Sequence, residues 1–117
     1  MKIGDLARRA DVTTSRIRFY EREGLLDAAP RTPNGYRDYG DRYLKIIAFI
    51  ERAQRLGFSL REIKAFLDLP ALKRSGSSLL PKLRLKLVEI DAHLLEVRAR
   101  RDEVEQLIGV LEQRTGL

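Results

Sequence analysis

Residues 3–26 of this chain read IGDLARRADVTTSRIRFYEREGLL. Apolar residues recur at helical spacing over residues 3–10, which predicts a short helix with one apolar side. A turn at Asp11-Val12 follows, and Thr13 can cap a second helix by accepting a hydrogen bond from a freed backbone N–H. That helix is expected to run to about Glu23, because the glycine after it can adopt the left-handed conformation that ends a helix. Two short helices joined by a tight turn form a helix-turn-helix.

Residues 31–39, RTPNGYRDY, predict a hairpin after these two helices. Pro30 and Pro33 exclude helix, and Asn34-Gly35 is a signal for a two-residue hairpin turn because both positions tolerate positive φ. The hairpin would form a wing over about residues 28–39. A helix-turn-helix with a wing is an arrangement that holds duplex DNA.

Two further helices are expected to complete a DNA-binding domain over residues 1–69. Asp41 is expected to cap the third helix and Gly57 to stop it. Ser59 and Glu62 have the spacing of a capping box, which predicts a fourth helix over about 60–68. The apolar face of the third helix would consist of Leu44, Ile47, Ile50 and Ala53.

The remaining chain predicts a linker, one long helix and a tail. Residues 70–78 are expected to form the linker, with Ser75-Gly-Ser-Ser78 as a flexible hinge. The helix is expected over residues 79–112, with Pro81 tolerated in its first turn, and residues 113–117 would form the tail.

The long helix carries apolar residues with a heptad period, which predicts a dimeric coiled coil. A helix packed on its own domain is the alternative, but such a helix usually has a wider apolar stripe and is shorter. Arg101 is the one charged residue on the predicted seam. The apolar seam residues are Leu80, Leu83, Leu87, Ile90, Leu94, Val97, Val104, Ile108 and Leu111.

Arg101 favours an antiparallel arrangement of the two helices. A parallel dimer would bury this charge against its own copy, which is costly. An antiparallel register that pairs Leu80 with Leu111 brings Arg101 beside Ile90, with Asp91 of the second chain adjacent to neutralise it. The sequence therefore predicts a contact between Arg101 and Asp91 across the dimer.

Composition limits the function further. The net charge of +6 and the pI near 10.0 favour a polyanionic partner. The absence of cysteine excludes disulfides, thiolate metal sites and thiol redox sensing by this chain. His93 is the one histidine, and no nucleophile–base pair, phosphate loop or metal cluster is recognisable, so neither an enzyme nor a bound cofactor or metal is expected. With no long apolar run and no signal peptide, a soluble intracellular protein without membrane contacts is expected.

Candidate DNA contacts fall on the second helix and on the wing. Base contacts are expected from the first turns of a recognition helix, and here these are Ser15 and Arg16. Backbone contacts are expected from Thr14, Arg18 and Tyr20. The wing would present Asn34, Gly35, Tyr36, Arg37 and Tyr39 to phosphates or to the minor groove. As an alternative, Phe19, Tyr20 and Tyr39 could be ordinary core aromatic residues.

Five blocks of residues, in this order and spacing, resemble the MerR-type bacterial regulators. The blocks are Ile3-Gly4-Asp5-Leu6-Ala7, Ile17-Arg18-Phe19-Tyr20-Glu21, Gly24-Leu25-Leu26, Gly35-Tyr36-Arg37-Asp38-Tyr39 and Leu56-Gly57-Phe58-Ser59-Leu60-Arg61-Glu62-Ile63. The long helix after them also fits, so the resemblance covers essentially the whole chain.

The resemblance implies a mainly all-α homodimer whose winged heads are joined by an antiparallel coiled coil. Such regulators bind a pseudo-palindromic element in promoters whose spacer is too long, distort the spacer DNA and act with RNA polymerase in the bacterial cytoplasm, at the nucleoid. By position, the resemblance implies DNA contacts by Thr14, Arg16, Arg18, Tyr20, Tyr36, Arg37 and Tyr39.

The sequence also departs from the family pattern. Position 16 is commonly a small or hydroxylated residue in this family and is arginine here, and the cysteines of the metal and superoxide sensors are absent. An effector could instead lie between the head and the long helix, near Phe58, Phe66, Leu69 and Leu72. The alternative function is an architectural DNA-binding protein of the excisionase type, without an effector. Such proteins usually lack a long dimerisation helix.

Overall fold

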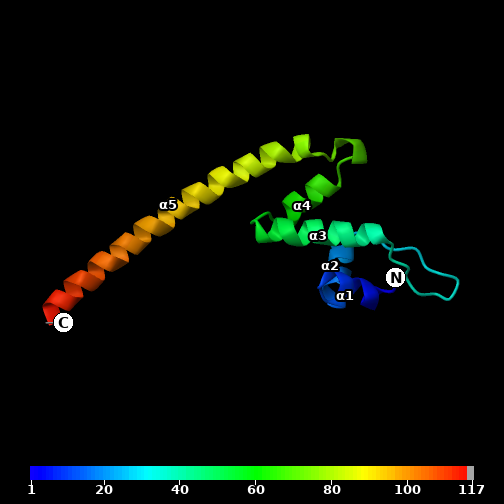
Figure 1. Ribbon diagram of the computed structural model, residues 1–117, viewed down its shortest axis with the longest axis horizontal. Helices are drawn as coiled ribbons and strands as arrows, with labels where there is room; N and C mark the ends of the chain where they lie inside the picture. Colours follow the sequence, from blue (N-terminus) through cyan, green and yellow to red (C-terminus); the bar gives the residue numbers. More distant parts are fainter. Residues whose placement is uncertain (116–117) are drawn as a thin grey trace. The chain divides into compact units, whose positions relative to one another are not determined.

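The computed structural model describes residues 1–115, and it is mainly helical as expected (Figure 1). Its helices are α1 (Ile3–Ala10), α2 (Thr14–Arg22), α3 (Asp41–Arg55), α4 (Leu60–Leu67), the short 3₁₀ helix η1 (Ala71–Lys73) and α5 (Gly76–Thr115). The chain divides into two compact units, a head of residues 1–74 and a second unit that begins at Ser75. Within residues 1–115, no helix is both long enough and apolar enough to cross a lipid bilayer.

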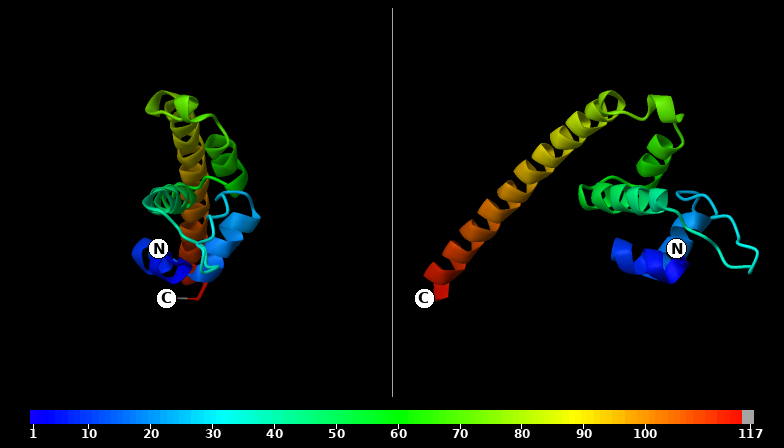
Figure 2. Two further views of the ribbon diagram at one scale, coloured as in Figure 1. Left: turned by 90° about the vertical axis from the view of Figure 1, so that its right-hand side faces the viewer. Right: turned by 45° about the vertical axis from the view of Figure 1, so that its right-hand side comes forward.

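The core of the head is formed where α1, α2 and α3 meet. α1 packs on both α2 and α3, and α4 packs on α3 (Figures 1 and 2). The buried face of α3 is shifted from the expected one, because Tyr43 is buried and Leu44 is only half-buried. The core residues are Leu6, Ala7, Ile17, Tyr20, Leu25, Leu26, Ala29, Tyr39, Tyr43, Ile47, Ile50, Ala53 and Ile63.

The ends of the short helices follow the capping signals in the sequence, with one exception. The Thr13 hydroxyl accepts a hydrogen bond from the Arg16 amide at 3.0 Å, which confirms the cap of α2. Ser59 and Glu62 exchange hydrogen bonds of 3.1 and 2.9 Å, which confirms the capping box of α4. The prediction for Asp41 was wrong, because it is the first residue of α3 and the cap position belongs to the preceding glycine. Its carboxylate complements the helix dipole without capping an N–H.

Residues 28–39, here called the hairpin, form a turn that differs from the expected one. Thr32 N donates to Tyr36 O at 2.8 Å and Gly35 N donates to Thr32 O at 2.9 Å. Three residues, Pro33, Asn34 and Gly35, therefore form the loop, and only the glycine has a positive φ, +88°. The two-residue turn was a wrong prediction, because proline fixes φ near −65° and fits the first central position of a three-residue loop.

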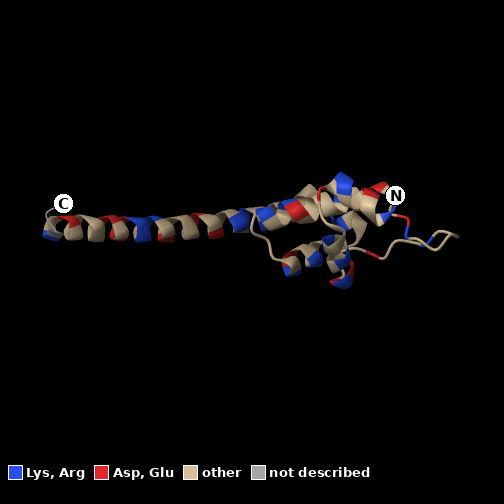
Figure 3. Ribbon diagram, turned by 90° about the horizontal axis from the view of Figure 1, so that it is seen from below, with Lys and Arg blue, Asp and Glu red and all other residues tan. Residues whose placement is uncertain are grey.

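The long helix begins earlier than expected. Ser75 N donates to Ser78 Oγ at 3.0 Å, and Ser78 N donates to Ser75 Oγ at 3.4 Å, so the two serines cap α5 reciprocally. The expected flexible hinge over residues 75–78 is therefore largely the first turn of the helix, and Pro81 lies beyond that turn. At the other end α5 reaches Thr115, so most of the expected tail is helical, and residues 116 and 117 lie outside the described residues. Basic and acidic residues occur in short groups that are interspersed along α5 (Figure 3).

Candidate nucleic-acid interface

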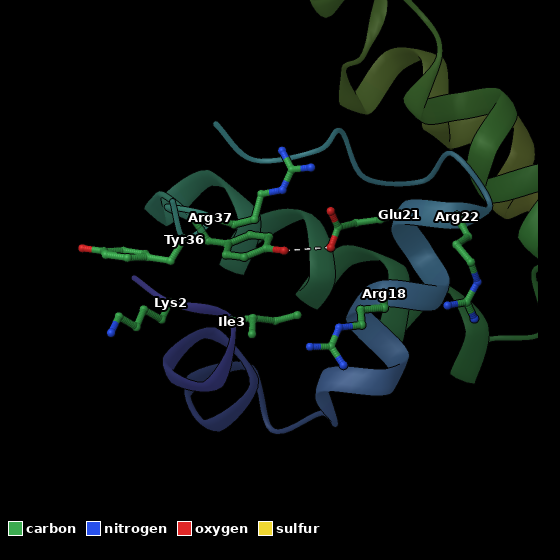
Figure 4. A pocket seen from close by; sticks show the side chains of 8 residues that line it. Lys2, Ile3, Arg18, Glu21, Arg22, Tyr36 and Arg37 are labelled. Carbon is green, nitrogen blue, oxygen red and sulfur yellow. Dashed lines mark hydrogen bonds between the residues drawn. The ribbon is translucent and has the colours of Figure 1, made fainter. Parts of the chain in front are cut away.

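A basic groove of about 500 Å³ runs between α2, the start of α1 and the hairpin (Figure 4). Four of its residues are basic and one is acidic, so the groove favours an anion. The basic groove is lined by Lys2, Ile3, Arg18, Glu21, Arg22, Tyr36, Arg37 and Tyr39.

α2 supplies two cations of this groove that have no ion-pair partner within residues 1–115. Arg18 and Arg22 are exposed, and among residues 1–115 neither forms an ion pair or a side-chain hydrogen bond. They lie one helical turn apart on α2, and both line the basic groove (Figure 4). Cations without a partner in the protein can bind phosphate without first breaking an internal contact.

The hairpin wall of the groove is held in shape by its own side chains. Arg37 Nη1 donates to the carbonyl oxygen of Ala29 at 2.7 Å, and Arg31 Nη1 donates to that of Gly35 at 2.8 Å. Arg37 therefore stabilises the hairpin through this hydrogen bond and also contributes positive charge to the basic groove. The ammonium of Lys2 lies 4.7 Å from the centre of the Tyr36 ring, a cation–π contact that joins α1 to the hairpin.

The base of the hairpin is also tied to the N-terminus. The Met1 amino group donates to Asp38 Oδ1 at 2.8 Å and to the Tyr39 carbonyl oxygen at 2.9 Å. Tyr39 N returns a hydrogen bond to the Met1 carbonyl oxygen at 2.7 Å. These contacts hold the base of the hairpin next to the start of α1. Because of this, Lys2 and Ile3 line the basic groove together with hairpin residues.

Tyr20 and Tyr39 have core positions in the structure. Their exposed fractions are 1% and 2%, and both hydroxyls are bound to protein carboxylates. Tyr39 donates to Glu21 Oε1 at 2.8 Å and packs edge-on against Tyr43. Both hydroxyls are hydrogen-bonded within the head, which favours the alternative of core aromatic residues, although Tyr39 also lines the basic groove. A DNA contact by either tyrosine stays a prediction.

Arg16, at the start of α2, is paired with a residue of α3. Its Nη1 atom donates to Glu51 Oε1 at 2.8 Å. The hydrogen bond and the charge of Glu51 raise the pKa of Arg16 further above its ordinary value. The second carboxylate oxygen, Oε2, accepts a hydrogen bond from the Tyr20 hydroxyl at 2.9 Å.

The other predicted contact residues lie on exposed parts of the same two elements. Ser15 is exposed and Thr14 is half-buried in the first turn of α2, and Asn34 and Gly35 are exposed at the tip of the hairpin. The structure thus brings Arg18, Tyr36 and Arg37 into one groove. Lys2, Ile3, Glu21 and Arg22 were not predicted as groove residues, and no spacing in the sequence relates the first two to the hairpin.

The predicted effector residues have different environments. Phe66 is buried and stacks on Phe49 with ring centres 5.3 Å apart, so it serves the head's own packing. Phe58 and Leu69 are half-buried, and Leu72 is 98% exposed on η1. Within the head these four side chains do not share one environment, and a role in effector binding stays a prediction.

Comparisons with known proteins match both units. Residues 1–69 match the model of the MerR HTH family regulatory proteins, and residues 44–113 match a second family model described as MerR, DNA binding. The HTH-type transcriptional regulator CueR of Salmonella typhi is 34% identical over 117 residues, which cover 99% of this chain and 83% of CueR.

Solved structures agree with this. The N-terminal part of MtaN, the Bacillus subtilis multidrug transporter activator, superposes with a TM-score of 0.71 at 25% identity, covering 89% of this chain and 96% of that one. HiNmlR, a MerR family regulator that lacks the sensor domain and is bound to promoter DNA, has the same fold. Its TM-score is 0.61 at 22% identity, over 87% of this chain and 78% of that one.

Proposed function

This chain belongs to the MerR family of DNA-binding transcriptional regulators, and we propose that it acts as a homodimer joined through α5. The dimer binds a pseudo-palindromic promoter element and distorts the DNA between the two half-sites, where RNA polymerase also binds. The family and the relatives are regulators and not enzymes.

The exposed apolar seam of α5 carries this proposal. The nine apolar seam residues, from Leu80 to Leu111, are each 38–58% exposed on a helix of 40 residues. An isolated helix with a continuous apolar seam of this length is covered in solution by another apolar surface. A second copy of α5 offers the same heptad period, and both copies could bury their seams together.

The basic groove supports the placement of DNA on the head. Arg18 and Arg22 reach from α2, while Tyr36 and Arg37 reach from the hairpin, so one strand of duplex DNA could be held between helix and wing (Figure 4). In such a dimer, duplex DNA must match the separation between the two heads. DNA whose half-sites do not match that separation must bend or untwist to contact both heads, at an energy that depends on its sequence.

The dimer is tested with two adjacent leucines of α5. Leu94 lies on the seam and Leu95 lies off it, and both are exposed in the single chain. We expect Leu94→Glu to shift the mass measured by sedimentation equilibrium to that of a monomer, because it buries a carboxylate at the seam. Leu95→Glu, the matched control, should leave a dimer. If Leu95→Glu lowered the measured mass as much as Leu94→Glu did, the dimer contact would not be confined to the predicted seam.

Distortion of the DNA is tested on the promoter fragment that the protein selects. Fluorophores at the two ends of the fragment report bending by energy transfer, and transcription by purified bacterial RNA polymerase reports regulation. We expect protein binding to change both the end-to-end distance of the DNA fragment and the yield of transcript. Bending with no change in transcription would favour the architectural alternative.

A further inference from the structure

We propose that Glu51 of α3 is a positioning residue for sequence reading, which holds the guanidinium of Arg16 so that its remaining N–H groups contact a guanine in the major groove. The inference rests on the proposed function in one respect, namely that the first turn of α2 faces DNA. Neither residue belongs to the basic groove, so the inference concerns a second contact region of the head.

Arg16 and Glu51 form an ion pair between α2 and α3, in which the carboxylate is mostly buried and the guanidinium is exposed. Arg16 and Glu51 are 35 residues apart, and their side chains meet at 2.8 Å. The side chain of Arg16 is 54% exposed, whereas that of Glu51 is only 17% exposed. The carboxylate is therefore embedded in the head, and the guanidinium lies on the surface above it.

Glu51 is itself held in place by a buried hydroxyl. Tyr20 lies one helical turn after Arg16 and is buried, and its hydroxyl lies 2.9 Å from Glu51 Oε2 and 2.9 Å from the side-chain oxygen of Gln54. A hydroxyl has one proton, so it donates to one of these two acceptors at a time. With Oε1 on Arg16 and Oε2 within reach of Tyr20, the carboxylate cannot rotate without losing a contact.

Within residues 1–115, this arrangement leaves most of the side-chain N–H donors of Arg16 without a hydrogen-bond partner. A guanidinium has five N–H groups in a fixed planar fork, and one of them is bonded to Glu51. Guanine presents two acceptors, O6 and N7, on its major-groove edge, and an arginine fork matches them with two parallel hydrogen bonds. An arginine already held by a carboxylate has lost its rotamer freedom before DNA binds, so less of the binding free energy is spent on ordering it.

The location of Arg16 suits this role. It is the third residue of α2, and its own backbone N–H is capped by Thr13 at 3.0 Å, so the Cα position is fixed. The first turns of a recognition helix are the part that reaches base edges.

The charge of Glu51 gives the test a distinctive signature. A carboxylate near DNA repels phosphates, so neutralising it should leave binding to unrelated DNA unchanged or stronger. If Glu51 also positions Arg16, the same change should reduce the preference for the correct base. A residue that only stabilised the fold would weaken binding to every sequence alike, and one that competed with DNA for Arg16 would improve the preference when neutralised.

The experiment uses the full chain and an operator selected from random-sequence DNA. Affinities are measured for that operator, for a panel with each base pair of one half-site exchanged, and for an unrelated duplex. We expect the wild type to prefer guanine at one position by roughly 5- to 150-fold, the range for a bidentate contact, and Arg16→Ala to abolish that preference.

Glu51→Gln decides the inference. It should reduce the guanine preference by about threefold or more, a coupling usual for contacting side chains, without weakening binding to the unrelated duplex. The double variant Arg16→Ala/Glu51→Gln should show no less preference than Arg16→Ala alone. Asp41→Asn removes the same charge from α3 without touching Arg16, and it should keep the wild-type preference. Circular dichroism melting of each variant separates altered reading from unfolding.

The outcomes separate this inference from the proposed function. A wild-type preference that survives in Glu51→Gln, or one that increases, overturns the positioning role while leaving the dimeric regulator intact. Equal losses on all sequences for Arg16→Ala would also overturn it, since Arg16 would then contact the DNA backbone. A wild type with no preferred sequence would instead contradict the proposed function itself.

Discussion

Arg18 is an exposed cation of the basic groove, and no carboxylate neutralises it within residues 1–115. Phosphate contacts release counterions, and each contact adds about one to the slope of log K against log salt concentration. We expect Arg18→Ala to weaken binding to all DNA sequences and to reduce that slope by about one for each head. Fluorescence anisotropy titrations over a range of salt concentrations measure both quantities.

The control for Arg18 is Arg9, which is exposed at the end of α1 and does not line the basic groove. Arg9→Ala removes the same charge, so it should leave the salt slope close to that of the wild type. An equal reduction in the two variants would show that net charge, and not the groove, determines the salt dependence.

Tyr39 and Tyr20 make the head sensitive to alkaline pH. Burial, followed by a hydrogen bond to a glutamate, raises the pKa of each from 10.0 to about 12. The unfolded chain therefore loses these protons near pH 10 while the folded head retains them. Their contribution to stability is fully present below pH 10 and is lost as the pH rises to about 12. Urea unfolding at a series of pH values from 9 to 12 should show this decline.

Tyr39→Phe distinguishes the loss of stability caused by tyrosine ionisation from other effects of alkaline pH on the head. The variant loses a hydrogen bond to Glu21 and should be less stable at neutral pH. Its stability should nevertheless fall less steeply between pH 10 and 12, because one of the two shifted groups is gone. If the free energy of unfolding of the variant fell as steeply as that of the wild type, ionisation of Tyr39 would not be a cause of the decline.

These residues also illustrate how far the sequence predicts a site. Arg18 and Arg37 were identified from their type and position, and both lie in the basic groove. Tyr20 and Tyr39 were assigned to DNA although they are buried, because an aromatic residue beside an arginine is equally compatible with core and surface. Burial depends on which helix packs over the residue, and the pairing of Arg16 with Glu51 depends on the packing of α2 on α3.

At the scale of the element, the hairpin depends on one glycine. Gly35 has φ of +88°, where an L-residue other than asparagine or aspartate costs about 1–2 kcal/mol, although a Cβ would meet no neighbour within 4 Å. We expect Gly35→Ala to open the turn, so that the Thr32 and Gly35 amides, both hydrogen-bonded now, exchange with solvent faster. Hydrogen exchange followed by NMR measures this.

Gly35→Asn is the matched variant, since asparagine tolerates the left-handed region. It should retain slow exchange at the Thr32 amide and near-normal DNA affinity. If alanine were tolerated as well as asparagine, the turn would not depend on the positive φ at this position.

The sequence predicted the elements better than their junctions. The caps at Thr13 and Ser59 were predicted correctly because each depends on residues within one turn. The apolar periodicity of residues 3–10 likewise predicted the observed bounds of α1. The start of α5 was misplaced because the Ser-Gly-Ser-Ser run was interpreted as a flexible hinge and Pro81 was placed in the first turn of the helix. Reciprocal hydrogen bonds between Ser75 and Ser78 stabilise a helical turn there instead.

At the scale of the whole molecule, the orientation of the proposed dimer remains a prediction from charge. In the single chain Arg101 pairs with Glu105 of its own helix at 2.7 Å, one turn further on. A parallel dimer would still bring two copies of Arg101 together on the seam. The antiparallel register instead brings Arg101 next to Asp91 of the second chain, and it pairs Leu87 with Val104.

The natural absence of cysteine allows this register to be tested by crosslinking. Leu87→Cys alone should form no covalent dimer on mild oxidation, because in the antiparallel register residue 87 lies far from its own copy. A mixture of Leu87→Cys and Val104→Cys chains should form a disulfide-linked heterodimer, since a bridge requires Cα atoms within about 7 Å. Denaturing gels without reductant distinguish these products. Efficient crosslinking of the Leu87→Cys chain to itself would mean that the helices run parallel, and the heads would then lie at the same end of the dimer.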